Sequence, residues 1–137
     1  MPRRIRVNTD KSYRVFGPFS QAIKTDNFVF VSGQLPINPS TGEIVKGGIK
    51  EETHQVLANL KEVLKAAGSS MEDVIKATIF ITNMDDFSKV NEVYEKFFSK
   101  EAPPARSTVE VSGLAKGARV EIEATALVGK TQKSKYR

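Results

Sequence analysis

The segment from residue 51 to residue 82 restricts the fold most, because a helical pattern gives way there to a strand pattern within a few residues. Residues 51–67 place apolar side chains on one face at helical spacing, and Gly68 is suited to end a helix. Residues 71–73 can form a single helical turn, and residues 74–82 are rich in the β-branched and apolar side chains of a strand. The helical stripe consists of Val56, Leu57, Leu60, Val63, Leu64 and Ala67. This arrangement predicts a helix packed on a sheet.

The other predicted elements complete an alternating order along the chain. A strand is predicted at 28–33, a turn at 36–42 and a second helix near 86–99. Two further strands are predicted at 105–111 and 119–128. The inward face of the second helix is predicted to carry Phe87, Val90, Tyr94 and Phe97. The order strands, helix, strand, helix, strands predicts an α+β fold in which two helices pack on a sheet.

The last two predicted strands alternate polar and apolar residues in a compatible way. The polar face of the first strand is predicted to carry Arg106, Thr108 and Glu110, and that of the second Glu121, Glu123 and Thr125. Only the Gly-containing loop 112–118 separates the two strands. We therefore expect them to lie side by side, with Arg106 and Glu121 on one common polar face.

The predicted strands carry apolar side chains on both of their faces. Phenylalanines alternate with valines in 28–33, and Phe80 lies opposite Ile79 and Ile81 in the strand at 74–82. Two helices can cover only one face of such a sheet. A second subunit would cover the other face, and a longer loop folded over it is the alternative.

The length and charge of the chain limit its organisation and its partners. The 137 residues predict one domain, 1–137, with its core at about 15–129. The net charge of +5 suggests nucleic acid as a partner. However, residues 1–14 and 130–137 each carry +4, whereas the body carries −3, and short charged ends are often frayed and solvated. Nucleic acid is therefore not expected as a partner.

The sequence offers few groups for catalysis. It has no Cys, which excludes thiol chemistry and disulfides and fits a reducing compartment such as the cytoplasm. Its one histidine, His54, lies off the apolar stripe of the first predicted helix, where a surface or helix-edge position is expected. There is no Gly-rich phosphate loop, no G-x-S-x-G elbow and no multi-His metal site. No apolar run has the length of a membrane span, and the first residues lack the apolar stretch of a secretory signal.

Arg106 and Glu121 are the remaining candidates for chemistry. Arg106 follows Pro103-Pro104 at the start of a strand, where its guanidinium can hold a small carboxylate through two parallel hydrogen bonds. Glu121 is expected on the same polar face, where its carboxylate can hold or activate a water molecule. The alternative is a cross-strand ion pair between these two side chains.

Several motifs, in order and at consistent spacing, resemble the Rid (RidA, YjgF) family of reactive-intermediate imine deaminases. The resemblance runs from about residue 17 to residue 128. The motifs are Gly17-Pro18-Phe19-Ser20-Gln21-Ala22, Val31-Ser32-Gly33-Gln34-Leu35-Pro36, Asn59-Leu60, Asn91-Glu92-Val93-Tyr94 with Phe97-Phe98, Pro104-Ala105-Arg106-Ser107-Thr108-Val109-Glu110-Val111, Leu114, and Val120-Glu121-Ile122-Glu123-Ala124.

The resemblance implies a fold, an assembly and an activity. The fold is the chorismate-mutase-like mixed sheet with two helices on one face. The assembly is a homotrimer whose sheets form an inner barrel and whose active sites lie between neighbouring subunits. The activity is the hydrolysis of 2-imino acids or their enamine tautomers, released by pyridoxal-phosphate enzymes such as threonine and serine dehydratases, to 2-oxo acids and ammonia. No cofactor is implied.

The resemblance also implies roles for individual residues. Arg106 matches the arginine that holds the substrate carboxylate, and Glu121 matches the glutamate that positions the attacking water. The matching positions Gly33 and Thr108 line the site with their backbone. Ser32 and Asn91 would be neighbouring or supporting groups.

Two positions depart from the family pattern. Many imine-deaminating members carry Tyr where this chain has Phe19, which keeps the aromatic wall and lacks the hydroxyl donor. Activity would then be reduced, shifted toward apolar side chains, or carried by another hydroxyl. Position 108 is often Cys in the family and is Thr108 here.

Two other functions remain open at this point. One is a non-catalytic trimer that binds small carboxylates or acts like a chaperone in the same clefts. The absence of a tyrosine hydroxyl at Phe19 is compatible with this function. The other is a ribonuclease or translation inhibitor, as some relatives are labelled. The single histidine and the negatively charged body argue against RNA cleavage.

Overall fold

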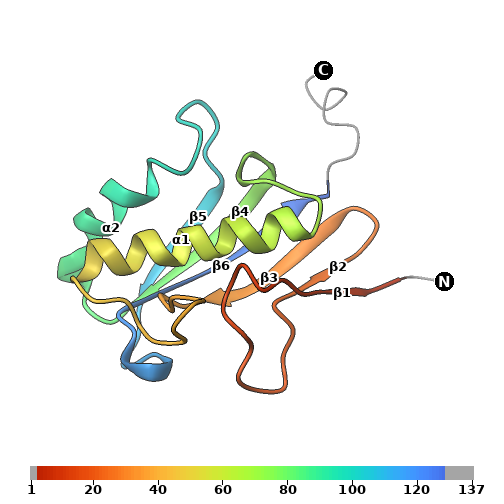
Figure 1. The fold of residues 1–137 in the computed structure, drawn as a ribbon. Coiled ribbons are helices and arrows are strands. Elements are labelled where there is room, and N and C mark those ends of the chain that lie inside the picture. Colours follow the sequence, from red (N-terminus) through yellow and green to blue (C-terminus); the bar gives the residue numbers. More distant parts are fainter. Residues whose placement is uncertain (1–2, 129–137) are drawn as a thin grey trace.

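The computed structural model describes residues 3–128, which form six strands and two α-helices (Figure 1). The strands are β1 (Ile5–Val7), β2 (Ala22–Lys24), β3 (Phe28–Gln34), β4 (Val74–Ile81), β5 (Ala105–Glu110) and β6 (Val120–Leu127). The helices are α1 (Ile49–Ala66) and α2 (Phe87–Tyr94). The strands make one sheet in the order β1-β2-β3-β6-β4-β5, in which β4 and β5 are parallel and all other neighbours antiparallel. The predicted α+β fold is confirmed, and the sheet is mixed.

Both helices lie on the same side of the sheet, with α1 running across its middle (Figure 1). The predicted apolar stripe of α1 faces the sheet: Leu57, Leu60 and Leu64 are fully buried, as are Ile79 of β4 and Ile122 of β6. Burying such side chains is the main source of stability in a domain of this size. The core therefore lies between α1 and the centre of the sheet.

Helix α1 starts two residues before the predicted range and ends where the sequence indicates. Gly68 has a φ of +80°, the left-handed conformation that glycine adopts at lowest cost. Its N–H donates to the carbonyl of Lys65, and the N–H of Ser69 donates to the carbonyl of Leu64. These two bonds satisfy carbonyl groups of the last helical turn, so the chain turns sharply toward β4.

The order of the strands corrects the predicted pairing of the last two strands. Strand β4 lies between β5 and β6, so β5 and β6 are not neighbours. The prediction was wrong because a short loop does not decide pairing: the eight-residue strands β4 and β6 both run along the centre of the sheet. Strand β5 pairs in parallel with β4 and forms an edge.

The register also corrects the prediction that Arg106 and Glu121 share a face. Arg106 lies beside Ala77, which is fully buried on the helix side, whereas Glu121 lies beside Phe80 on the open side. Side chains of paired residues point to the same face, and successive residues alternate. The two side chains therefore project from opposite faces. Across the sheet the two residues are two strand spacings apart, about 10 Å. Along the strands they are offset by three residues, again about 10 Å.

Helix α2 is shorter than predicted. It covers eight residues and follows the 3-10 turn Met84–Asp86, whose N-cap Asn83 accepts a hydrogen bond from the N–H of Asp85. Tyr94 is buried as predicted, and so is Val90. Phe87, also predicted to face inward, is 37% exposed.

The structure describes most of the N-terminal basic segment, whereas the C-terminal basic segment lies beyond the described residues. Part of the N-terminal basic segment belongs to the sheet, because β1 pairs with β2 and Val7 is buried. The C-terminal basic stretch 130–137 lies outside the described residues. Within residues 3–128, neither helix combines the length and the apolar character that crossing a bilayer requires.

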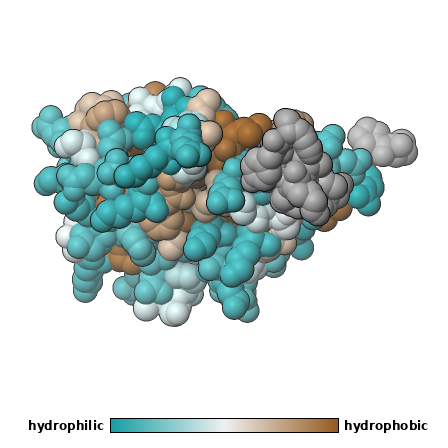
Figure 2. All heavy atoms as spheres, turned by 90° about the horizontal axis from the view of Figure 1, so that it is seen from above, coloured by the Kyte–Doolittle hydropathy of each residue, from teal (hydrophilic) through white to brown (hydrophobic). Residues whose placement is uncertain are grey.

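The face of the sheet opposite the helices carries large apolar side chains, as predicted from the alternation. The register places Phe28, Phe30, Phe80, Val109 and Leu127 on this open face. Phe30 is 48% exposed and Val109 is 41% exposed. A view from above shows how apolar residues elsewhere on the surface gather in patches between hydrophilic ones (Figure 2).

Candidate active site

Glu121 lies against a bulge in β3 that brings its carboxylate next to Gly33. The register of β3 against β6 shifts between Val31 and Gln34. A Cβ atom at Gly33 would overlap the carboxylate of Glu121. Any side chain at position 33 would therefore displace the carboxylate of Glu121, so the predicted site residues Gly33 and Glu121 are direct neighbours.

The hydroxyl of Tyr13 fixes this bulge from the other side. It donates a hydrogen bond to the carbonyl of Gly33 (3.2 Å) and accepts one from the N–H of Leu35 (2.9 Å). Burial, with a smaller contribution from the nearby charge of Glu121, raises the pKa of Tyr13 to about 12. Tyr13 thus stays a neutral hydrogen-bonding group at physiological pH.

Ser32 and Phe19 complete this group of residues, which we call the Glu121 half-site. The hydroxyl of Ser32 donates to the carbonyl of Ser20 (2.7 Å), so it ties the segment that carries Phe19 to β3. Phe19 is 40% exposed and meets Phe16 edge to face at 5.6 Å. Phe16 in turn stacks on Tyr13 at 6.3 Å, which connects Phe19 to the bulge. The half-site as defined here consists of Phe19, Ser32, Gly33 and Glu121.

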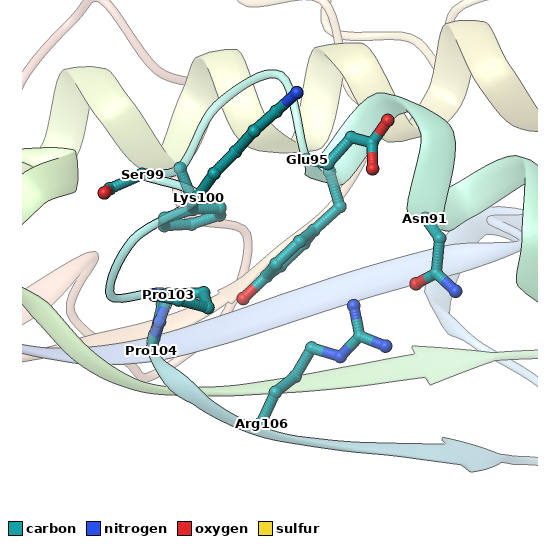
Figure 3. A pocket seen from close by; sticks show the side chains of 9 residues that line it. Asn91, Glu95, Ser99, Lys100, Pro103, Pro104 and Arg106 are labelled. Atoms are coloured by element: carbon teal, nitrogen blue, oxygen red, sulfur yellow. The ribbon is translucent and has the colours of Figure 1, made fainter.

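A second group surrounds Arg106 on the helix side of the sheet. A pocket of about 580 Å³ lies between α2, the loop that follows it and the start of β5. Asn91, Tyr94, Phe98, Pro104 and Arg106 are among its lining residues. The side chains of Asn91 and Arg106 point toward one another in this pocket (Figure 3). We call Asn91, Arg106 and Thr108 the Arg106 half-site.

Two aromatic rings of α2 contact the guanidinium of Arg106. Its central carbon lies 4.8 Å from the ring centroid of Tyr94 and 5.6 Å from that of Phe87. No ion pair with an acidic side chain involves Arg106 within residues 3–128. The alternative of a cross-strand ion pair with Glu121 is thereby wrong for the single chain, since the two lie on opposite faces.

Three buried oxygen atoms near Arg106 have no hydrogen-bond partner. They are the Oδ1 of Asn91, the hydroxyl of Tyr94 and the Oγ1 of Thr108. Buried polar atoms without partners in the chain are rare in folded proteins, and water or a bound group commonly satisfies them. Burial also raises the pKa of Tyr94, partly offset by the positive charge of Arg106.

The predicted site residues thus form two half-sites that one chain does not join. The sequence reasoning missed Tyr13, Phe87 and Tyr94 as part of these surroundings, although Phe87 and Tyr94 were predicted for the inward face of α2. Their seven-residue spacing, two helical turns, is the signal that places both on one side of the helix. His54 is exposed on α1, as expected, with its ring 5.4 Å from that of Phe97.

The electrostatics of the two half-sites suit different tasks. Burial, and secondly the neighbouring charge of Glu123, raises the pKa of Glu121 above its ordinary value. A carboxylate whose pKa is raised is a better proton acceptor when ionised. The guanidinium of Arg106 is always charged and fits a carboxylate. No cluster of three or more His, Asp or Glu side chains that could hold a metal ion occurs in the described part of the chain.

A family profile described as Endoribonuclease L-PSP matches residues 9–128. The chain belongs to this family. The family includes the Rid proteins that the sequence motifs resemble, so that resemblance is confirmed. The matched residues include every strand from β2 to β6 and therefore both half-sites.

Individual L-PSP family members are similar over nearly their whole length. The chain is 55% identical to the RutC family protein of Pyrococcus horikoshii over 88% of this chain and 94% of that one. It is 46% identical to 2-iminobutanoate/2-iminopropanoate deaminase of Capra hircus over 93% and 91% of the two chains. The crystal structure of E. coli TdcF with bound serine has a TM-score of 0.85 and 40% identity over 90% of this chain and 98% of that one.

Proposed function

We propose that this protein is a 2-iminobutanoate/2-iminopropanoate-type deaminase, a hydrolase that converts reactive imine and enamine intermediates to 2-oxo acids and ammonia. The observation that carries the proposal is sequence identity to proteins named 2-iminobutanoate/2-iminopropanoate deaminase, from 43% with the human protein to 46% with the goat protein over at least 90% of this chain. The geometry supports it, because Arg106 and Glu121 supply a carboxylate clamp and a base.

The reaction needs little from the protein beyond orientation. In the protonated imine the carbon is already electrophilic, so water adds to that carbon, the C–N bond breaks and the nitrogen leaves as ammonia. Arg106 holds the substrate carboxylate through two parallel hydrogen bonds. Glu121, in its ionised form, holds the attacking water, accepts its proton and returns it to the nitrogen. When the C–N bond then breaks, the added oxygen releases its remaining proton and becomes the carbonyl of the 2-oxo acid. Orientation of this kind accounts for large rate gains without a cofactor.

The two half-sites meet between subunits in this proposal. Because Arg106 and Glu121 leave opposite faces of the sheet, one copy supplies the Arg106 half-site and another the Glu121 half-site. The apolar open face, with Phe28, Phe30 and Val109 exposed, supports assembly through that face. The assembly is the homotrimer implied by the family resemblance, in which the three sheets form an inner barrel.

The substrate is a small 2-imino acid. E. coli TdcF, which is similar over 90% of this chain, has a bound serine in its crystal structure, and serine carries an α-carboxylate like that of the proposed substrate. Backbone groups of Gly33 and Thr108, with Asn91 and Ser32 as supporting residues, would line the site. Phe19 gives the site an apolar wall, which favours imines with apolar side chains.

The test is a reaction in which threonine dehydratase releases 2-iminobutanoate, followed by the appearance of 2-oxobutanoate and ammonia. Wild-type protein should shorten the lifetime of the imine, and Arg106→Ala should remove most of that effect. If the imine decays as slowly as in buffer, or if Arg106→Ala is as active as wild type, the proposal fails. Saturable binding of 2-oxobutanoate without imine turnover would instead favour the non-catalytic carboxylate-binding function.

The description Endoribonuclease L-PSP favours RNA cleavage as a second candidate. The described structure offers it little support, since His54 packs on Phe97 away from both half-sites and the body of the chain is negatively charged. Cleavage of a defined RNA by protein purified free of nucleases, retained after removal of residues 130–137, would support this candidate. Absence of cleavage under those conditions would exclude it.

A further inference from the structure

The surroundings of Arg106 hold its guanidinium without using its hydrogen-bond donors. The guanidinium lies over two aromatic rings, with Tyr94 at 4.8 Å and Phe87 at 5.6 Å from its central carbon to the ring centroid. An aromatic ring attracts a cation through its quadrupole and offers no oxygen lone pair. An acidic partner would also hold Arg106, but it would compete with a substrate carboxylate for the same N–H groups. Among residues 3–128 no such acidic partner is present.

The two rings differ in how firmly they are fixed. Tyr94 is only 6% exposed, and its ring lies 4.4 Å from that of Phe98 in a tilted contact. Phe87 is 37% exposed and lies near the first turn of α2. Cation–π contacts strengthen when they are removed from water. Tyr94 therefore contributes more to the orientation of Arg106 than Phe87 does.

We propose that Tyr94 and Phe87 are positioning residues, which orient the guanidinium of Arg106 through their rings and leave its N–H groups free for the substrate carboxylate. This inference rests on the proposed function, in which Arg106 binds that carboxylate. The aromatic ring carries the role, and the hydroxyl of Tyr94 is not required for it. An arginine ordered before the substrate arrives loses less entropy on binding, so the rings increase affinity.

The test compares variants that keep or remove each ring. Tyr94→Phe keeps the ring, and Tyr94→Leu removes it; Phe87→Tyr and Phe87→Leu do the same at the more exposed position. Phe97→Leu is the matched control, because Phe97 is an aromatic residue three positions beyond Tyr94 that contacts His54 and not Arg106. The affinity for 2-oxobutanoate is measured by calorimetry, and kcat and KM for the imine are measured separately. Thermal unfolding reports whether each variant is folded.

The expected pattern is specific. Tyr94→Leu should raise the Kd for 2-oxobutanoate, and the KM, by about 5- to 30-fold, the size of one desolvated cation–π contact. Phe87→Leu should raise both by about 3-fold. Tyr94→Phe, Phe87→Tyr and the Phe97→Leu control should stay within about 2-fold of wild type, and kcat should change less than KM in every variant.

Two results would overturn the inference. One is wild-type affinity in folded Tyr94→Leu and Phe87→Leu; the other is a loss of affinity in Phe97→Leu as large as in Tyr94→Leu, since general packing would then be the cause. Failure of the proposed function is a separate outcome. A wild-type protein that binds 2-oxobutanoate with this pattern but does not hydrolyse imines would contradict deamination and support the role of the rings.

Discussion

At the scale of single residues, the charge state of Glu121 sets the expected pH dependence. Burial and Glu123 raise the pKa of this carboxyl above 4.5, so its proton is retained to higher pH than usual. Because the ionised form holds the attacking water, kcat should fall as the pH decreases through a value above 4.5. Glu121→Gln should be slower by about 10²-fold or more and should lack this acidic limb in a pH–rate profile. An unchanged acidic limb in the Gln variant would assign it to another group.

Protein stability provides an independent check on the same pKa. Between the ordinary pKa of 4.5 and the raised pKa in the folded state, the unfolded chain has lost a proton that the folded protein still holds. Stability therefore falls as the pH rises through this window and is constant above it. Relative to wild type, Glu121→Gln should gain stability above the window, in urea unfolding at several pH values. A relative gain that appears only at acidic pH would contradict the sign of this shift.

Thr108 carries a buried hydroxyl that the protein does not use. Its Oγ1 has no hydrogen-bond partner, and an unsatisfied buried group costs about 1–3 kcal/mol. Thr108→Val should therefore leave the free energy of unfolding unchanged or raise it by about 1 kcal/mol. Activity should stay within about 3-fold, because the proposed site uses only the backbone at this position.

Thr53→Val is the matched control for Thr108→Val. Thr53 is fully buried in α1, and its hydroxyl donates a 2.7 Å hydrogen bond to the carbonyl of Ile49. Removing a satisfied hydroxyl should lower stability by about 1 kcal/mol. If Thr108→Val abolishes activity while the protein remains folded, the hydroxyl contacts the substrate and the backbone-only role is wrong.

At the scale of elements, one buried carboxylate fastens α1 to the start of β6. Glu52 is 3% exposed and accepts hydrogen bonds from the backbone N–H (2.9 Å) and the Nε (3.0 Å) of Arg119. We expect Glu52→Ala to lower the free energy of unfolding by about 2–4 kcal/mol, since two bonds to a charged acceptor are lost and the N–H of Arg119 loses its partner. Urea unfolding measures the change.

The ion pair between Lys50 and Glu92 provides the contrast on the same helix. It joins α1 to α2 at 2.7 Å, but both side chains are at least half exposed. Water and salt screen such a pair, so Lys50→Ala should lower stability far less than Glu52→Ala does. Equal losses of stability in Glu52→Ala and Lys50→Ala would show that burial of the Glu52 carboxylate does not determine how much it stabilises the fold.

The elements that the sequence predicts well are those determined by local patterns. Helix α1, its end at Gly68 and strand β4 each follow from a long periodic run or from one residue with a special backbone conformation. Strands β1 and β2, three residues each, have no such run and are recognisable only by their pairing with each other and with β3. Pairing of this kind is non-local, which is why single segments do not reveal it.

The sequence motifs name candidate site residues one by one, but they do not give the arrangement of these residues in space. The motifs point to Arg106, Glu121 and Gly33, and the structure places Gly33 and Glu121 in contact. Whether Arg106 and Glu121 share a face depends on which strand pairs with which. Strand β4 lies between β5 and β6, and the registers of its two pairings put Arg106 and Glu121 on opposite faces. No alternation within β5 or β6 contains this information.

At the scale of the whole molecule, the sheet itself separates the two halves of the site. A side chain extends only a few ångströms from its strand, and the helix-covered core lies behind the sheet on the Arg106 side. Closing the site within one chain would require unfolding an edge of the sheet. A second copy can present its Glu121 half-site to Arg106 without any such change, so the open apolar face and the divided site point to the same proposed assembly.

Mixing two inactive variants tests this division of the site. Arg106→Ala leaves the Glu121 half-site intact, and Glu121→Gln leaves the Arg106 half-site intact, so neither alone should turn over imine. In a trimer whose sites lie between neighbours, every mixed assembly contains one site with both residues, so coexpression in equal amounts should restore about a quarter of wild-type activity. Coexpression of Arg106→Ala with a chain carrying both substitutions is the control and should remain inactive, because no subunit then supplies Arg106. If the first mixture is as inactive as the control although mass spectrometry detects mixed trimers, Arg106 and Glu121 do not act across a subunit boundary.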